Sequence, residues 1–165
     1  MASNVRPKVF RAINSRCSGC SMCELVCSLN KTGTVSPSLA RIKVMFSESD
    51  FTFRPIICRH CTNAPCEAAC PVSGAMVQDA NTGAWAIDEA HCIACLACVE
   101  ACPFGAIRVG PNREILKCDL CGGDPLCVQH CPPRPLPPPE QSSLQYVEPH
   151  TVVVGQRAAL LATKK

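Results

Sequence analysis

Cysteine is the residue whose number and spacing point to chemistry in this sequence. Sixteen cysteines occur among 165 residues, in four groups of four with nearly the same internal spacing. With x for any residue, the first and third groups follow C-x2-C-x2-C-x3-C, the second C-x2-C-x4-C-x3-C and the fourth C-x2-C-x5-C-x3-C. Proline follows the last cysteine in three groups, and Ser28 takes that place in the first. These groups, called runs 1 to 4, are Cys17, Cys20, Cys23 and Cys27; Cys58, Cys61, Cys66 and Cys70; Cys92, Cys95, Cys98 and Cys102; and Cys118, Cys121, Cys127 and Cys131.

This spacing is typical of bacterial ferredoxins, in which three thiolates of a run bind one [4Fe-4S] cube and the fourth reaches a neighbouring cube. Two-residue spacers let a short loop wrap around a cluster. The fourth cysteine follows after about one helical turn, so its side chain points away from that loop, and the proline prevents the helix from continuing. Four intact runs therefore predict four [4Fe-4S] clusters.

Two other uses of cysteine fit the sequence less well. Zinc is bound tetrahedrally, usually by two C-x2-C pairs, and the third cysteine of each run would have no role there. A disulfide scaffold belongs to exported proteins, but residues 1–16 contain four basic residues and no apolar run of signal-peptide length. We therefore expect a cytoplasmic protein. No membrane span is predicted, because the apolar tract at residues 151–161 is shorter than the roughly 20 residues required.

Short strands and helices are expected between the runs. The segments after runs 2 and 3 predict β-hairpins, which pair residues 75–78 with 84–87 and residues 106–109 with 114–116. A helix is predicted to start near Pro65, with Asn63 as its cap. Further strands are predicted at residues 39–46 and 51–57. The large apolar side chains are few for a chain of this length, so we expect metal–ligand bonds to supply part of its stability.

The predicted fold class is α+β, with two fused bacterial-type two-cluster ferredoxin units, one inserted in the other. Residues 51–116 would form the inner unit, and residues 1–50 with 117–135 the discontinuous outer unit. The proline-rich stretch within residues 132–165 is expected to be an extended polyproline strut that enters neither helix nor sheet. The apolar end of the tail beyond it would either form a small strand on its own domain, which is the favoured option, or act as a docking arm.

Charge and motifs exclude several classes of function. The formal net charge of +3 counts cysteines as neutral, and four thiolate-bound cubes would shift the total to about −5. Nucleic-acid binding is therefore not expected, and the few aromatic residues do not alternate with basic ones. No phosphate loop, dinucleotide fingerprint or nucleophile–base pair is present, so no catalytic residue is predicted. His60 and His130 could donate hydrogen bonds to clusters, but we favour ordinary surface or packing roles.

Residues 17–132 resemble the four-cluster polyferredoxin subunits that serve molybdenum and tungsten oxidoreductases, formate dehydrogenases and hydrogenases. The resemblance is carried by the four runs, their order and their sixteen cysteines. It implies a non-catalytic electron-transfer subunit in which each cube takes three ligands from one run and one from its paired run. The implied ligand sets are Cys17, Cys20, Cys23 and Cys131; Cys118, Cys121, Cys127 and Cys27; Cys58, Cys61, Cys66 and Cys102; and Cys92, Cys95, Cys98 and Cys70.

Within that family, the chain length and the fourth run look most like the small iron–sulfur subunit of tungsten aldehyde oxidoreductases. This likeness implies a tungsten- or molybdenum-pterin catalytic partner that oxidises aldehydes, and a second redox partner such as a flavoprotein or a soluble ferredoxin. Subunits of carbon monoxide dehydrogenase, hydrogenase or formate dehydrogenase complexes are the alternative. A structural or sensing iron–sulfur protein and a freely diffusing ferredoxin also remain open. Copies of the chain could stack into a longer conducting assembly.

Overall fold

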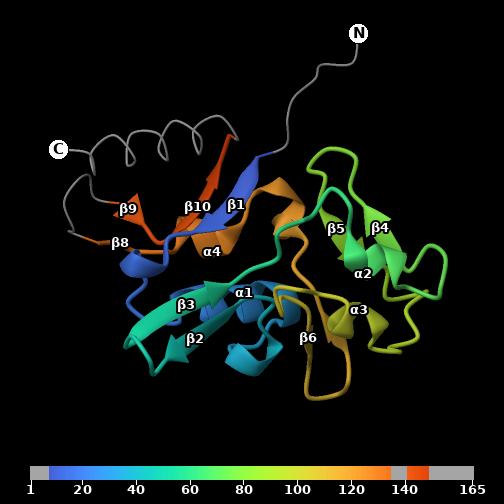
Figure 1. Cartoon of the computed structure of the whole chain (residues 1–165), viewed down its shortest axis with the longest axis horizontal. Coiled ribbons are helices and arrows are strands. Elements are labelled where there is room, and N and C mark those ends of the chain that lie inside the picture. Colours follow the sequence, from blue (N-terminus) through green and yellow to red (C-terminus); the bar gives the residue numbers. More distant parts are fainter. Residues whose placement is uncertain (1–7, 135–140, 149–165) are drawn as a thin grey trace, which may run out of the picture.

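Short strands lie between the four cysteine runs, and each run contains a helix or part of one (Figure 1). The computed structural model describes residues 8–134 and 141–148. Small hairpins with a few helices confirm the predicted α+β class. The helices are α1 (Met22–Thr32), α2 (Pro65–Ala68), α3 (Ala97–Glu100) and α4 (Leu126–Gln129), with 3₁₀ turns at Asn14–Arg16, Pro37–Leu39 and Leu120–Gly123. The strands are β1 (Val9–Ala12), β2 (Lys43–Ser47), β3 (Thr52–Ile56), β4 (Met76–Gln78), β5 (Trp85–Ile87), β6 (Arg108–Val109), β7 (Ile115–Leu116), β8 (Pro133–Arg134), β9 (Gln141–Ser142) and β10 (Leu144–Val147).

The predicted hairpins are present in shorter form. Strands β4 and β5 pair antiparallel after run 2, and β6 and β7 pair in the same way after run 3. Strands β2 and β3 form a third hairpin with each other. The predicted strand at residues 39–46 starts too early, because Leu39 ends a 3₁₀ turn that Pro37 begins. The Arg41 amide then donates to Cys27 Sγ at 3.3 Å instead of joining a strand.

Each of the last three runs contains a helix of four residues that ends before the run's final cysteine. Helix α1 instead has 11 residues and continues through the position where the other runs have proline. Buried Ser28 stands there, and its hydroxyl donates to the Leu25 carbonyl and accepts from the Ser36 amide, both at 3.0 Å. The cap predicted for α2 is wrong. Ala64, not Asn63, is the capping residue, because the proline at the first helical position keeps the residue before it extended.

The two ends of the described chain meet in one small sheet, which the sequence did not indicate. Strand β1 pairs antiparallel with β10, and Phe10 lies opposite Tyr146. Strand β8 pairs with β9, so the prediction that the proline-rich stretch avoids sheets is wrong at Pro133–Arg134. Pro133 is the first residue of β8, where the missing amide hydrogen is tolerated. The rest of the predicted strut, at residues 135–139, and the apolar tract at residues 151–161 lie outside the described residues.

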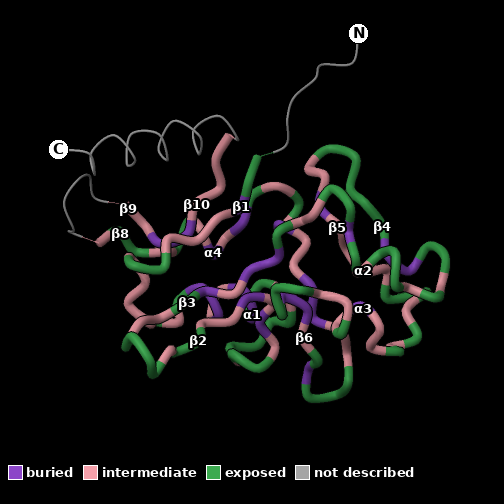
Figure 2. The backbone as a smooth tube through the Cα atoms, viewed as in Figure 1, coloured by how far each residue is buried: buried purple, intermediate pink, exposed green. Residues whose placement is uncertain are grey.

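Two small clusters of buried side chains form the core of the described part, and both include cysteines of the runs. Figure 2 shows the buried residues concentrated along the middle of the molecule. Helix α1 packs against α4, and α2 packs against α3. Run 1 is therefore brought to run 4 and run 2 to run 3, the pairing that the sequence analysis expected.

Candidate iron–sulfur centres

Four cavities lie between the paired runs, and each is lined by the four cysteines of one implied ligand set, with Cys58 as a fifth cysteine in one of them. In every cavity three of these cysteines come from one run and the fourth is the last cysteine of the paired run. All sixteen cysteines are free of disulfide bonds. Cavity A is lined by Cys17, Cys20, Cys23 and Cys131; cavity B by Cys118, Cys121, Cys127 and Cys27; cavity C by Cys58, Cys61, Cys66 and Cys102; and cavity D by Cys92, Cys95, Cys98 and Cys70.

The four cavities are nearly equal in size. Their empty volumes, open mouths included, are about 340 Å³ for A, 390 Å³ for B, 340 Å³ for C and 350 Å³ for D. The thiols are spread around each space, and among the described residues no three His, Cys, Asp or Glu side chains are placed to hold a single metal ion. Four similar cavities with four thiols each fit four copies of one multi-atom group.

Left-handed backbone conformations curl the loops that present the first three thiols of a run. In run 1, Gly19 and Ser21 have φ values of 73° and 57°. In run 3, Ala94 and Leu96 adopt φ values of 52° and 70°. Such conformations are costly for residues other than glycine and persist where the surrounding structure requires them. Here they turn the chain around a cavity instead of letting it extend past it.

Backbone amides point at several of the sulfurs. The Arg41 amide donates to Cys27 Sγ at 3.3 Å, and the Ala106 amide donates to Cys102 Sγ at 3.4 Å. The Leu120 amide donates to Cys118 Sγ, also at 3.4 Å. Hydrogen bonds of this kind stabilise a thiolate and tune the reduction potential of the cluster that it binds.

The buried thiols need a positively charged partner in order to ionise. Burial, with a smaller effect of Glu24 and neighbouring cysteines, raises the pKa of Cys23 to about 12. Burial also raises the pKa of Cys118 to about 12 and that of Cys127 above its usual value. A metal cluster supplies the positive charge that holds such thiols as thiolates. The donor set therefore fits a cluster of iron and sulfide.

The cavities follow one another in the order A, B, C, D. Cys23 of cavity A packs in the same buried cluster as Cys27 and Cys127 of cavity B. Cys58 of cavity C also lines cavity B. Cys66 and Cys102 of cavity C pack against the buried cluster that contains Cys98 of cavity D. Each cavity thus adjoins the next, which makes a continuous row.

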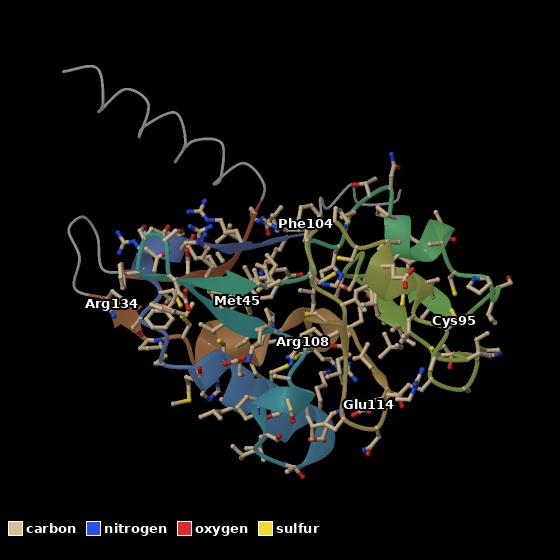
Figure 3. All side chains as sticks on the ribbon, turned by 60° about the horizontal axis from the view of Figure 1, so that its bottom comes forward. Met45, Cys95, Phe104, Arg108, Glu114 and Arg134 are labelled. Carbon is tan, nitrogen blue, oxygen red and sulfur yellow. The ribbon has the colours of Figure 1, made fainter. Side chains whose placement is uncertain are left out.

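Both ends of this row reach the surface. Among the sixteen cysteines, Cys20 of cavity A and Cys95 of cavity D are exposed. Figure 3 shows Cys95 at the edge of the molecule, on the side away from Met45 and Arg134. A group bound in cavity A or cavity D would therefore lie near solvent, whereas cavities B and C lie between them.

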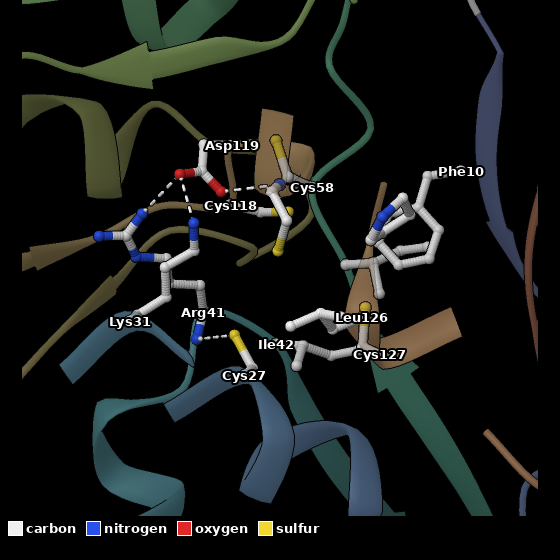
Figure 4. A pocket seen from close by; sticks show the side chains of 13 residues that line it. Phe10, Cys27, Lys31, Arg41, Ile42, Cys58, Cys118, Asp119, Leu126 and Cys127 are labelled. Carbon is white, nitrogen blue, oxygen red and sulfur yellow. Dashed lines mark hydrogen bonds and ion pairs between the residues drawn. The ribbon is translucent and has the colours of Figure 1, made fainter. Parts of the chain in front are cut away.

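Cavity B has a network of charged side chains on one side (Figure 4). Asp119 Oδ2 accepts hydrogen bonds from Lys31 Nζ at 2.7 Å and from Arg41 Nη1 at 3.1 Å, and its Oδ1 accepts from the Cys121 amide at 3.0 Å. Burial opposes ionisation of Asp119, but these donors and the two cations outweigh it and keep the pKa of the carboxyl below its usual value. The sequence analysis did not single out any of these three charged residues.

Cavity C has a different surrounding. Lys117 lines it and is 2 % exposed, and its ammonium donates to Cys58 Sγ at 3.6 Å and to the Trp85 carbonyl. His60 lines it as well, and burial, followed by the charge of Lys117, lowers the pKa of His60 to about 4. The partly buried His60 is compatible with the favoured packing role, and a hydrogen bond from it to a cluster stays a prediction. The only indication of Lys117 in the sequence is that it directly precedes Cys118, the first cysteine of run 4.

The second histidine of the runs behaves as the sequence analysis favoured. His130 is exposed, and its Nδ1 lies 3.0 Å from the Leu126 carbonyl, one turn earlier in α4. It does not line any of the four cavities. The described residues also contain no helix with the length and apolar character needed to cross a bilayer.

Comparison with known proteins places the chain in an iron–sulfur family. Residues 49–137 match the model of the 4Fe-4S dicluster domain, and these residues hold runs 2, 3 and 4. The chain belongs to this family. It is 39 % identical over 133 residues to the polyferredoxin-like subunit of an aliphatic sulfonate oxidoreductase from Pyrococcus furiosus, which covers 79 % of this chain and 76 % of that protein.

Two further relatives are named as subunits of oxidoreductases. The thiosulfate reductase electron transfer subunit PhsB of Salmonella typhi is 34 % identical over 71 % of this chain and 67 % of its own length. The beta subunit of an NADH-dependent phenylglyoxylate dehydrogenase from Aromatoleum evansii is 35 % identical over 72 % of this chain. The match spans only 27 % of that longer protein. The family is thus found with more than one kind of oxidoreductase.

Proposed function

We propose that this chain is a non-catalytic electron-transfer subunit that holds four [4Fe-4S] clusters, one in each of cavities A to D. The observation that carries the proposal is the continuous row of four-thiol cavities with an exposed cysteine at each end. Each cavity's four cysteines are the proposed ligands. A [4Fe-4S] cluster takes up and returns one electron, at a potential set by hydrogen bonds to sulfur, burial and nearby charge.

The residues of the chain would contribute in three ways. Each loop presents three thiolates, and the last cysteine of the paired run closes the cavity from the other side. Buried side chains such as Ile107, which lines cavity C, would keep water away from the thiols. The exposed cysteines, Cys20 and Cys95, mark where electrons would enter and leave, because transfer to a partner requires close approach.

The four cavities also support a division into two units, the outer one with cavities A and B and the inner one with cavities C and D. The outer unit would comprise residues 1–50 and 117–135, and the inner unit residues 51–116. The packing of α1 on α4 and of α2 on α3 supports this division. The role of residues 132–165 as strut and docking tail, and the stacking of copies through them, stay predictions.

The proposed partners are a catalytic oxidoreductase subunit at one end of the row and a second redox protein at the other. A tungsten- or molybdenum-pterin subunit that oxidises aldehydes is the first choice, from the resemblance found in the sequence, and the cytoplasm is the proposed compartment. The named relatives serve sulfonate, thiosulfate and phenylglyoxylate oxidoreductases. These relatives support a role in a redox complex. The catalytic partner differs from one relative to another, so they do not favour any single partner for this chain.

A structural or sensing iron–sulfur protein is the alternative of another class. One cluster suffices for sensing, whereas four adjoining cavities with exposed cysteines at the two ends favour conduction. Metal analysis and reductive titration separate the two. Anaerobically purified protein should contain about sixteen irons and accept about four electrons per chain. Fewer than about four electrons in a protein with full iron content would contradict conduction, and much less iron would contradict the four clusters.

A further inference from the structure

Lys117 is a buried cation at the middle of the row of cavities. It stands between β7 and run 4, and its ammonium reaches Cys58 Sγ at 3.6 Å. Cys58 lines both cavity B and cavity C. Among the described residues no carboxylate forms an ion pair with Lys117, so thiolates are the anions that can balance its charge. A buried lysine without a carboxylate is costly unless another anion lies beside it.

His60, which lines the same cavity, carries a second buried donor. Its Nδ1 accepts a hydrogen bond from the Trp85 amide at 3.1 Å, so the proton of the neutral ring is on Nε2. Nε2 is shielded from solvent and has no hydrogen-bond partner among the described residues. Buried N–H groups are normally paired. His60 lines cavity C, where a sulfur of a bound group would supply the missing acceptor.

The other cavities differ in charge. Of the residues that the structure describes, none that lines cavity D is charged. In cavity B, the charges of Lys31 and Arg41 are partly balanced by Asp119. Cavity C also has Arg59, but this side chain is exposed and lies over the Phe104 ring, so water screens its charge. Arg16 lines cavity A but is only partly buried. Among the described residues that line the four cavities, Lys117 is thus the cation that is buried.

We propose that Lys117 and His60 make cavity C the position in the row where a transferred electron is held most stably. This inference rests on the proposed function. One electron, supplied by the group in a neighbouring cavity, adds one negative charge to cavity C. The ammonium compensates that charge without uptake of a proton, and the His60 N–H bond to sulfur strengthens as the charge grows. An electron leaving cavity D would therefore move towards the middle of the row.

The test measures the potential of one cluster in the full-length holoprotein. Lys117→Met, Lys117→Gln and Lys117→Arg are compared with the wild type by potentiometric titration followed by EPR, with Cys66→Ser to identify the signal from cavity C. The Met and Gln variants remove the charge. At the wild-type midpoint potential, their ratio of reduced to oxidised cluster should be at least tenfold lower. This corresponds to a fall in the midpoint potential of about 59 mV. The Arg variant should restore most of it.

Two controls make the result specific. Lys8→Met removes an equal charge from an exposed residue beside Tyr146 and should leave all midpoints unchanged. If the Lys117→Met variant loses iron, the His60→Leu variant is measured in its place. It should lower the potential of the same cluster by a smaller amount. An unchanged midpoint in variants with full iron content, or an equal shift in Lys8→Met, would overturn the inference. Iron well below sixteen in the wild type would instead contradict the proposed function.

Discussion

At the scale of single residues, charged side chains have two roles around the cavities: contact with sulfur and contact between segments of the chain. Lys117 is directed at sulfur, whereas Asp119 mainly ties segments of the chain together. The Asp119 carboxylate accepts from Lys31 of α1 and from Arg41, which follows the 3₁₀ turn at Pro37–Leu39. It therefore fastens run 4 to the segments that follow run 1. The same contacts hold the wall of cavity B in place (Figure 4).

Asp119→Asn should destabilise the holoprotein by about 1–3 kcal/mol, because it removes the negative charge that two partly buried cations share. Each kcal/mol corresponds to about 2–4 °C in the midpoint of thermal unfolding. The measurement is anaerobic circular dichroism at one fixed scan rate. Asp50→Asn is the matched control, since Asp50 forms an exposed ion pair with Arg54, and it should give no measurable change. Equal midpoints for the Asp119 variant and the wild type would refute the role assigned to this network.

At the scale of elements, the loop of run 1 depends on contact with a hairpin outside the run. Gly19 has a φ of 73°, and a Cβ added to it would lie 2.5 Å from the ring of Phe53 in β3. The hairpin of β2 and β3 thus packs directly against the loop that presents Cys17, Cys20 and Cys23. A larger residue at position 19 must move either the loop or the hairpin.

Gly19→Ala should therefore reduce the iron content from about sixteen to about twelve per chain, by loss of the cluster in cavity A. Gly33→Ala is the control, because Gly33 has a similar φ of 69° but no atom within 4 Å of an added Cβ. That control carries the backbone cost alone, about 1–2 kcal/mol, and should retain all the iron. Iron analysis with EPR spin quantitation gives the readout. Full iron content in Gly19→Ala would show that the loop tolerates the displacement.

The sequence predicted what depends on local spacing and missed what depends on partners far along the chain. The runs, the hairpins after runs 2 and 3 and the early end of α2 follow from neighbouring cysteines, turn residues and proline. Pairing of β1 with β10 joins Phe10 to Tyr146, and no local pattern in either segment indicates the other. The burial of Lys117 could not be predicted from the sequence for the same reason, because its contacts are with Cys58 and Trp85, which lie far along the chain. The cysteine sets were grouped from resemblance, and their assignment as ligands stays a prediction.

At the scale of the whole molecule, the row of cavities passes through two cores. The larger core is built around Leu120 and Leu144 and includes Cys23, Cys27 and Cys127 of cavities A and B. The smaller one contains Met76, Cys98 and Ile107, which line cavities C and D. If the chain consists of two units, damage to one core should empty two cavities and spare the other two.

Leu144→Asp and Ile107→Asp test this division in opposite directions. Leu144 is 2 % exposed and lines cavity A, and Ile107 is 3 % exposed and lines cavity C. A carboxylate at either position is buried without a partner, which costs several kcal/mol and disrupts the local core. Each variant should retain about eight irons of the expected sixteen, with Leu144→Asp keeping the clusters of cavities C and D and Ile107→Asp those of A and B.

EPR redox titration identifies which clusters survive, because the signal marked by Cys66→Ser should persist in Leu144→Asp and disappear in Ile107→Asp. Val35→Asp introduces the same carboxylate at a residue that is 57 % exposed, and it should keep all the iron. Loss of every cluster in both core variants would show that the row folds as one cooperative body. In that case Cys58, which lines cavities B and C together, would be the point through which the two halves depend on each other.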